Sequence, residues 1–192
     1  MNEIELKAHV LNRRETENKL NSFAQFKSTV TKDDVYYFNP AISEKSIRIR
    51  KETENGNSRY LLTYKQKEKR TNESGHTIEV NNEKECTMSC AEPLESYFAD
   101  CGFSVKLKKH KEVSSWVYSI NGFDCTIELC NVPPLGDFVE LEILSEKDDD
   151  ETVSQARNAL YEILNLCGID KGCIESRYYS ELLKSVQGEN NV

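Results

Sequence analysis

The stretch EIELKAHV, residues 3–10, decides the fold, because its polar and apolar side chains alternate along the chain. Glu3, Glu5 and Lys7 fall on one face, and the aliphatic residues between them fall on the other. A two-residue period is that of a β-strand whose two faces meet different surroundings. The stretch therefore predicts a strand with one charged face and one apolar face.

The same alternation recurs through most of the chain. It is found in SIRIR (46–50), YLLTYKQK (60–67), TIEV (77–80), SSWVYSI (114–120), FDCTIELC (123–130) and FVELEIL (138–144). The pairs Asn55-Gly56 and Asn121-Gly122 are typical of hairpin turns between antiparallel strands. Strands therefore dominate the predicted structure, and short turns connect several of them.

Helical spacing of apolar residues interrupts the strands. It predicts helices over 12–27, from the Ser89-x-x-Glu92 capping pattern to Gly102, from the acidic run 148–151 to Gly168, and over 176–186. No linker rich in Pro, Gly or Ser divides the chain. We therefore predict one α+β domain over residues 1–185, followed by a flexible C-terminal tail, residues 186–192.

Composition argues against several classes of protein. The 192 residues include 33 acidic and 25 basic side chains, and this net charge of −8 argues against bulk nucleic-acid binding. The chain lacks the run of about 18 apolar residues that a transmembrane helix needs, and its charged start is unlike a signal peptide. Seven cysteines without a CxxC pair are typical of reduced thiols. We expect a cytoplasmic protein that binds neither nucleic acid nor a membrane.

Charges of one sign are paired at i, i+2 spacing, most of them on the predicted strands, so that both members of a pair would face the same way along a strand. The acidic pairs are Glu3/Glu5 and Glu140/Glu142, and the basic pairs are Arg48/Arg50, Lys65/Lys67 and Lys109/Lys111. Solvent-facing sheets usually mix the two signs, because like charges side by side repel. Two interpretations fit this pattern. The charged faces are either the solvated side of a sheet, which is the commoner arrangement, or the inner wall of a closed barrel.

The closed-barrel interpretation has a chemical consequence. Buried charge without a partner is costly, so water, ions or a ligand must occupy the lumen of such a barrel. Carboxylates bind hard cations such as Mg²⁺, whereas Arg and Lys bind phosphate oxygens. A polyphosphate that carries a divalent metal would need both sets of side chains.

A series of segments resembles, in chain order, the motifs of the CYTH domain family, also called the triphosphate tunnel metalloenzymes. The segments are Glu3-x-Glu5-x-Lys7 (ExExK), SIRIR (46–50), Lys65, Glu79, Lys109-His110-Lys111, LGDFVELE (135–142) and SRYYSELL (176–183). Together they extend from residue 3 to residue 183, which is nearly the whole chain. The last two are most similar to the class IV adenylyl cyclase branch, which has thiamine triphosphatase relatives.

The resemblance implies a closed eight-stranded antiparallel β-barrel, a triphosphate tunnel, with helices packed outside. The implied triphosphate-binding residues are Lys7, Arg48, Arg50, Lys65, Lys109, Lys111 and Arg177. The implied ligands of Mg²⁺ or Mn²⁺ are Glu140 and Glu142, with Glu3 and Glu5 beside them. The implied catalytic residues are Lys7, Arg48 and Glu79, of which Glu79 orients the basic groups. Glu5 and Glu142 could each pair with a neighbouring Lys or Arg instead.

Two departures from the family pattern concern metal binding and activity more than the fold. Cys130 stands where the cyclase branch usually has an aspartate, and a thiol is a soft, poor ligand for Mg²⁺. Glu128, two residues earlier on the same strand face, could partly replace that aspartate as a metal ligand. Gln66 replaces a glycine that commonly follows the lysine of the third basic strand.

The resemblance implies a metal-dependent enzyme that acts on a small-molecule triphosphate. The first candidate is a class IV adenylyl cyclase-like lyase that converts ATP to cyclic AMP and pyrophosphate. A hydrolase that releases phosphate from inorganic, thiamine or nucleoside triphosphate is the alternative, and a non-catalytic binder of polyphosphate or nucleotide is a further one. Homodimers are compatible with the resemblance.

Overall fold

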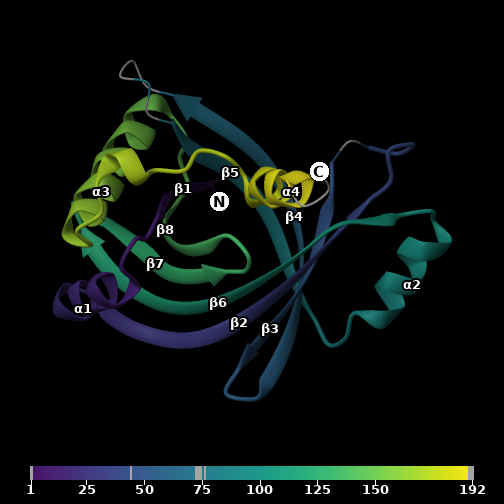
Figure 1. The fold of residues 1–192 in the computed structure, drawn as a ribbon. Coiled ribbons are helices and arrows are strands. Elements are labelled where there is room, and N and C mark those ends of the chain that lie inside the picture. The colour runs from purple at the N-terminus through teal and green to yellow at the C-terminus, as the bar shows by residue number, and fades with distance from the viewer. Residues whose placement is uncertain (1, 44, 72–74, 76, 190–192) are drawn as a thin grey trace.

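The chain forms a closed antiparallel barrel of eight strands with its helices outside (Figure 1). The computed structural model describes residues 2–43, 45–71, 75 and 77–189. The strands are β1 (Asn2–His9), β2 (Gln25–Phe38), β3 (Ile47–Glu54), β4 (Asn57–Thr71), β5 (Thr77–Met88), β6 (Ser104–Ile120), β7 (Phe123–Val132) and β8 (Gly136–Ser145). Around the barrel they follow the order β1-β5-β4-β3-β2-β6-β7-β8, and β8 pairs with β1 to close it. The predicted fold class is confirmed.

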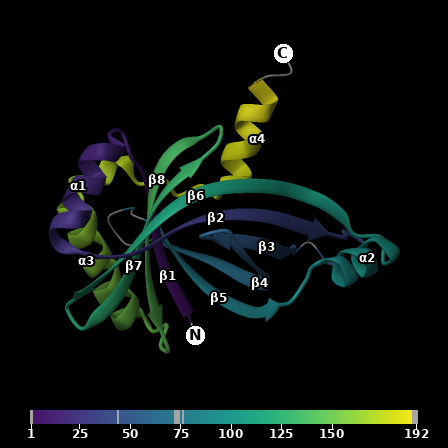
Figure 2. The ribbon, with the colours of Figure 1, turned by 90° about the horizontal axis from the view of Figure 1, so that it is seen from below.

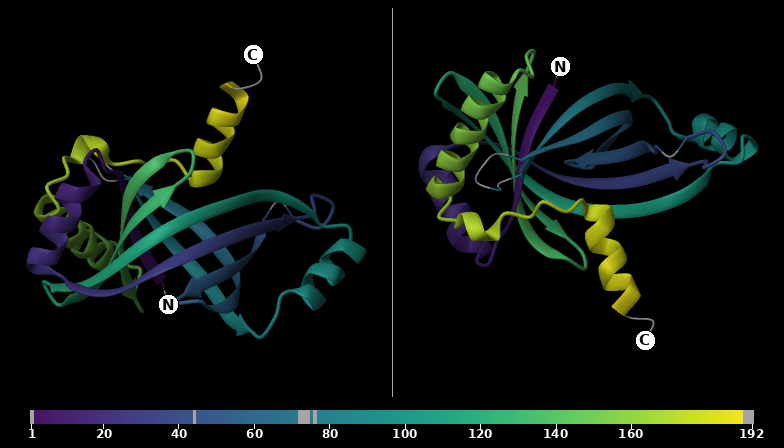
Figure 3. Two further views of the ribbon diagram at one scale, coloured as in Figure 1. Left: turned by 60° about the horizontal axis from the view of Figure 1, so that its bottom comes forward. Right: turned by 90° about the horizontal axis from the view of Figure 1, so that it is seen from above.

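Four α-helices and one short 3₁₀ helix accompany the strands in the part of the chain that is described. They are α1 (Arg13–Phe23), α2 (Glu92–Asp100), α3 (Asp150–Leu166), η1 (Lys171–Cys173) and α4 (Tyr179–Glu189). Helices α1 and α3 lie side by side against one end of the barrel, α2 covers the opposite end, and α4 projects from the body (Figures 2 and 3). None of the described helices has the length and apolar character needed to span a membrane.

The main apolar core lies outside the barrel, between its wall and α3. Ile4 and Leu6 point outward from β1 and pack in one buried cluster with Leu160 and Ile163 of α3. Since the apolar face of β1 is buried against a helix, its charged face must point into the barrel. The closed-barrel interpretation of the charge pattern is therefore correct, and the solvated-sheet interpretation is wrong.

Helix α3 begins and ends close to the predicted signals. The Asp149 side chain accepts a hydrogen bond from the Thr152 backbone N–H at 2.9 Å and caps the first turn. At the other end, Gly168 adopts a φ of +73°, which a residue with a side chain rarely tolerates. The Ile169 N–H then bonds the Leu164 carbonyl at 3.1 Å and closes the helix.

Three of the helix predictions were wrong in their boundaries. The capping pattern at Ser89 does not form, because α2 begins at Glu92 with Ala91 as its N-cap and no side-chain cap bond. Helix α1 ends at Phe23 instead of residue 27, and strand β2 starts at Gln25. Helix α4 begins at Tyr179 and extends to Glu189, beyond the predicted end at 186. The last part of the predicted tail, 190–192, lies outside the described residues.

Strands β2 and β6 are much longer than the sequence pattern indicated. The sequence predicted no strand over 25–38, and it placed the start of β6 at 114 instead of Ser104. Both strands pair along most of their length, from Gln25↔Val117 to Phe38↔Ser104. Polar residues occur on both of their faces, so the two-residue alternation is weak there.

Candidate active site

The barrel encloses a cavity of about 330 Å³, here called the lumen, whose wall is strongly charged. Acidic and basic side chains line it in equal number. The acids are Glu3, Glu5, Glu52, Glu79, Glu83, Glu85, Glu128, Glu140 and Glu142, and the bases are Lys7, Lys32, Arg48, Arg50, Arg59, Lys65, Lys67, Lys109 and Lys111. A wall that mixes both signs can hold a cation and an anion at the same time.

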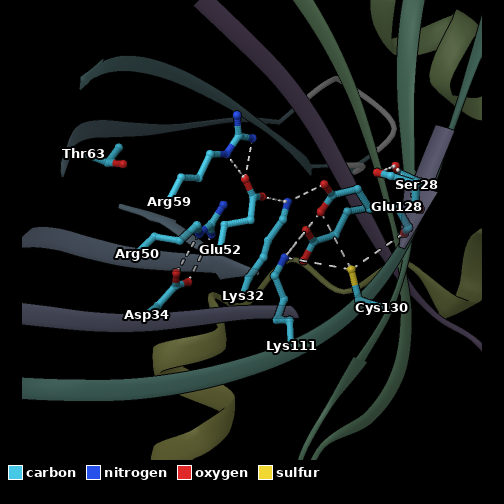
Figure 4. Close-up of polar contacts among 12 residues, drawn as sticks. Ser28, Lys32, Asp34, Arg50, Glu52, Arg59, Thr63, Lys111, Glu128 and Cys130 are labelled. Atoms are coloured by element: carbon cyan, nitrogen blue, oxygen red, sulfur yellow. Dashed lines mark hydrogen bonds and ion pairs between the residues drawn. The ribbon is translucent and has the colours of Figure 1, made fainter. Parts of the chain in front are cut away.

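Asp34 of β2 holds two of the predicted phosphate-binding residues in place. Its carboxylate, only 1% exposed, accepts a hydrogen bond from Arg50 Nε at 2.6 Å and lies 3.2 Å from Lys109 Nζ. Burial acts to raise the pKa of Asp34, but Lys109 and Arg50 outweigh it and hold that pKa well below its usual range. The carboxylate therefore stays ionised and fixes the orientation of both cations. Figure 4 shows its bonds to Arg50.

A chain of alternating charges crosses the lumen next to this group (Figure 4). Lys32 Nζ lies 2.5 Å from Glu128 and 3.7 Å from Glu52, while Lys111 Nζ lies 2.5 Å from Glu140 and 3.8 Å from Glu128. Burial acts to raise the pKa of Glu140, but Lys111 and Lys109 together hold it well below the ordinary value. Lys32 and Lys111 likewise lower the pKa of Glu128 against the effect of burial, so Glu128 and Glu140 are ionised at neutral pH and paired with ammonium groups.

Three carboxylates pair with the Lys65 ammonium group where β1, β4 and β5 meet, and a fourth lies beside them on β8. Lys65 Nζ contacts Glu3 and lies 3.3 Å from Glu5 and 3.4 Å from Glu83, while Glu142 stands directly opposite Glu5 in the pairing of β1 with β8. Burial raises the pKa of Glu142, and the nearby Glu3 and Glu5 raise it further, to about 9. Glu5 thus has the basic partner weighed in the sequence analysis, whereas no described basic side chain pairs with Glu142. The excess negative charge favours a bound cation.

The ligand atoms of Glu128, Cys130 and Glu140 all lie within 4.8 Å of one another, which makes them a candidate metal group. Their two carboxylates are donors that suit a hard ion such as Mg²⁺ or Mn²⁺. Cys130 does not suit such an ion, because burial raises the pKa of its fully buried thiol far above the usual range and keeps it protonated. The carboxylates of the lumen therefore fit the divalent metal, and Cys130 does not.

Most of the predicted site residues line the lumen together, although they come from seven strands. Those that do are Glu3, Glu5, Lys7, Arg48, Arg50, Lys65, Glu79, Lys109, Lys111, Glu128, Glu140 and Glu142. The structure does not bring the Arg177 guanidinium to this group. Its side chain is 57% exposed and binds Glu175 at 2.6 Å, while its backbone carbonyl accepts a hydrogen bond from Lys7 Nζ at 2.6 Å. Arg177 therefore reaches the site through its main chain.

The sequence analysis missed several lumen residues. They are Lys32 and Tyr36 on β2, Glu52 on β3, Arg59 on β4, Glu83 and Glu85 on β5, and the tyrosines Tyr178 and Tyr179. The sequence analysis also missed Asp34, which binds Arg50, and it named Lys67 only as the basic neighbour of Lys65, without a role in the site. The i, i+2 spacing from Lys32 through Asp34 to Tyr36 was a signal for a further lumen strand. It was obscured by the polar residues Thr31 and Asp33 on the opposite face of β2.

Two consecutive tyrosines before and at the start of α4 face lysines of the lumen. The Tyr178 ring centroid lies 4.0 Å from Lys67 Nζ, and the Tyr179 ring centroid lies 4.7 Å from Lys7 Nζ and 4.8 Å from Lys109 Nζ. The face of an aromatic ring attracts an ammonium group through its quadrupole. The C-terminal segment thus completes this part of the wall.

Comparison with known proteins gives the following relationships. The CYTH domain matches residues 1–179. No curated protein matches the chain. Among solved structures, the PH1819 protein of Pyrococcus horikoshii OT3 is 27% identical, with a TM-score of 0.75 over 95% of this chain and 98% of that one.

Two more distant structures share the fold. A proposed adenylate cyclase from Vibrio parahaemolyticus is 19% identical, with a TM-score of 0.69 over 95% of this chain and 97% of that one. HpAC1 from Hippeastrum, a proposed adenylyl cyclase described as having a dominant triphosphatase activity, is 12% identical, with a TM-score of 0.66 over 96% and 95% of the two chains.

Proposed function

The chain belongs to the CYTH domain family, and on this premise we propose that it is a metal-dependent enzyme acting on a small-molecule triphosphate bound in the lumen. One observation carries the proposal: acidic and basic side chains line a single enclosed cavity in equal number. The bases suit the phosphate oxygens and the acids suit the divalent metal that accompanies them.

The cations of the lumen would bind the phosphates in positions that are already set. Arg50 and Lys109 are oriented by Asp34, and Arg48 is oriented by Glu83 at 3.1 Å. A cation held in place before the ligand arrives costs little reorganisation when charge develops on the phosphates. Lys7, which bonds a backbone carbonyl and no described carboxylate, has its charge available for a phosphate.

The carboxylates Glu140 and Glu142, with Glu3, Glu5 and Glu128 beside them, would hold Mg²⁺ or Mn²⁺. When bound, the ion supplies charge neutralisation at the phosphate oxygens. Glu79 lies opposite Glu5 in the pairing of β5 with β1 and lines the same cavity, where it would orient Lys7 and Lys67. Lys7 and Arg48 would stabilise the negative charge of the transition state.

The first candidate reaction is cyclisation of ATP, in which the ribose 3′-hydroxyl attacks the α-phosphorus and pyrophosphate leaves. The second is hydrolysis, in which water attacks the terminal phosphorus. One observation argues against the cyclase: Cys130 stands in place of the aspartate that is usual in the cyclase branch. The fold is shared both with a proposed adenylate cyclase and with HpAC1, described as having a dominant triphosphatase activity, so it is compatible with either reaction. Loss of that carboxylate also makes the non-catalytic binder a distinct alternative.

The deciding experiment offers ATP, inorganic triphosphate and thiamine triphosphate separately to the purified protein with Mg²⁺ or Mn²⁺. Chromatography separates cyclic AMP, pyrophosphate and orthophosphate. Cyclic AMP with pyrophosphate would identify the cyclase, and orthophosphate without cyclic AMP would identify a triphosphatase. No turnover of any of the three, with binding retained, would contradict an enzyme and favour the binder.

A further inference from the structure

Two lumen cations, Lys7 and Lys67, differ from the rest because neither forms an ion pair within the described residues. Each remaining lumen cation has at least one carboxylate partner. These paired cations are Lys32, Arg48, Arg50, Arg59, Lys65, Lys109 and Lys111. The uncompensated positive charge of the lumen is therefore concentrated on Lys7 and Lys67.

Neutral groups hold both of these ammonium groups at the same end of the lumen. Lys7 Nζ donates to the Arg177 carbonyl oxygen at 2.6 Å and faces the Tyr179 ring at 4.7 Å. Lys67 Nζ faces the ring of the neighbouring Tyr178 at 4.0 Å. A carbonyl or an aromatic ring positions an ammonium group without cancelling its charge. An anion entering here would meet two oriented and unneutralised cations.

Lys69, two residues further along β4, lies over the same tyrosine ring as Lys67 but differs from it in ion pairing. Both lie over the Tyr178 ring, with Nζ at 4.0 Å and 4.1 Å from its centroid. Lys69 has an acidic partner, Glu181, at 3.7 Å and does not line the lumen. Lys67 forms no ion pair with a described residue, although Glu79 attracts it, and it is exposed to the lumen.

The surroundings of Lys67 agree with an anion-binding role. Protein packed around the ammonium group removes part of its hydration and lowers its pKa, and the attraction of Glu79 does not fully offset this effect. A bound anion would supply the missing stabilisation of the charged form. The ammonium group has three donors and free rotation, which suit the oxygens of a phosphate group.

We propose that Lys67 is a further substrate-binding residue, which acts with Lys7 to contact a phosphate group of the ligand at the end of the lumen beside Tyr178 and Tyr179. The proposal rests on the proposed function and deepens it. It adds a residue that lies outside the set implied by the CYTH resemblance.

The test is isothermal titration of the protein with inorganic triphosphate, first with EDTA and then with Mg²⁺, at constant ionic strength. Lys67→Gln should raise the dissociation constant about tenfold or more, because a charge-assisted contact is lost. Lys69→Gln is the matched control, since it removes the same charge from the same tyrosine ring; it should change affinity less than about twofold. Lys67→Arg keeps the charge and should recover most of the affinity.

The outcomes separate the two proposals. If wild-type protein binds triphosphate and Lys67→Gln binds equally well, the role of Lys67 is overturned while the proposed function stands. If Lys69→Gln weakens binding as much as Lys67→Gln, the effect is one of general charge, and the specific contact is again overturned. If wild-type protein binds triphosphate in neither condition, both proposals fail. Equal thermal unfolding temperatures for the variants would show that each is folded.

Discussion

The Lys111 ammonium group lies 2.5 Å from the Glu140 carboxylate inside the barrel. The first belongs to the predicted phosphate-binding set and the second to the predicted metal-binding set. The two groups neutralise each other, and Lys111 Nζ is also 3.9 Å from Cys130 Sγ. Each partner thereby keeps the other ionised in a site with little access to water.

Turnover should depend on both the basic and the acidic side chains of the lumen. We expect Lys7→Ala and Glu140→Ala each to lower kcat/KM for the best triphosphate substrate about a hundredfold or more, since each removes a charge that faces the reacting group. Lys27→Ala is the control, because Lys27 is exposed on β2 and bonds only Gln25 among the described residues. Steady-state kinetics with Mg²⁺ checks this expectation. Unchanged rates in both lumen variants would refute the site assignment.

The ion pair between Lys111 and Glu140 should contribute measurably to the free energy of unfolding. Lys111→Met leaves Glu140 without its nearest counter-charge, so we expect the free energy of unfolding to fall by about 3 kcal/mol. A double variant, Lys111→Met with Glu140→Met, should recover much of this loss, because no uncompensated charge remains between the two positions. Urea denaturation followed by circular dichroism measures both. Additive losses in the double variant would show that the two groups do not interact.

Cys130→Asp tests the departure from the family pattern. The new carboxylate would stand beside Glu128 and Glu140, whose ligand atoms lie within 4.8 Å of the present thiol. We expect the concentration of Mg²⁺ needed for half-maximal activity to fall about tenfold, because a hard ligand replaces a soft one. Cys130→Ser is the control, since it adds a polar oxygen without charge. An unchanged requirement for Mg²⁺ in both variants would mean that position 130 takes no part in metal binding.

Stability without metal should depend on pH through Glu142. Its pKa is about 9 in the folded protein, against 4.5 for an ordinary glutamate, so between these values the folded state binds a proton that the unfolded state has lost. The resulting stabilisation is fully present below pH 4.5 and is lost as the pH rises through about 9. In EDTA, the advantage of Glu142→Gln over wild type in unfolding free energy should therefore grow from pH 5 to pH 9. A difference that stays constant with pH would contradict the raised pKa.

The two-residue alternation of polar and apolar side chains along single strands was sufficient to predict many of the residues that line the lumen. Glu3, Glu5 and Lys7 of EIELKAHV line the lumen, and Ile4, Leu6 and Ala8 between them lie in the core. Arg48 and Arg50 of SIRIR and Glu140 and Glu142 of FVELEIL likewise line the lumen, with buried Ile49 and Leu141 between them. Local signals also located α3, whose cap at Asp149 and glycine at 168 lie near the predicted positions. Strand β2 could not be recognised in this way, because polar residues occupy both of its faces and its pairing with β6 stabilises it from a distant part of the chain.

The sequence by itself determined which side chains share a strand face, and that charges of one sign are grouped there. Only the tertiary structure decided which face points inward, because a solvated sheet and a closed barrel have the same local alternation. That choice follows from the pairing of β1 with both β5 and β8, and from the burial of Ile4 and Leu6 against α3. Long-range contacts also bring the Lys7 ammonium group to the Arg177 carbonyl and place Lys67 against the Tyr178 ring. No local pattern predicts these contacts, because their partners meet only when the barrel closes and the C-terminal segment packs against it.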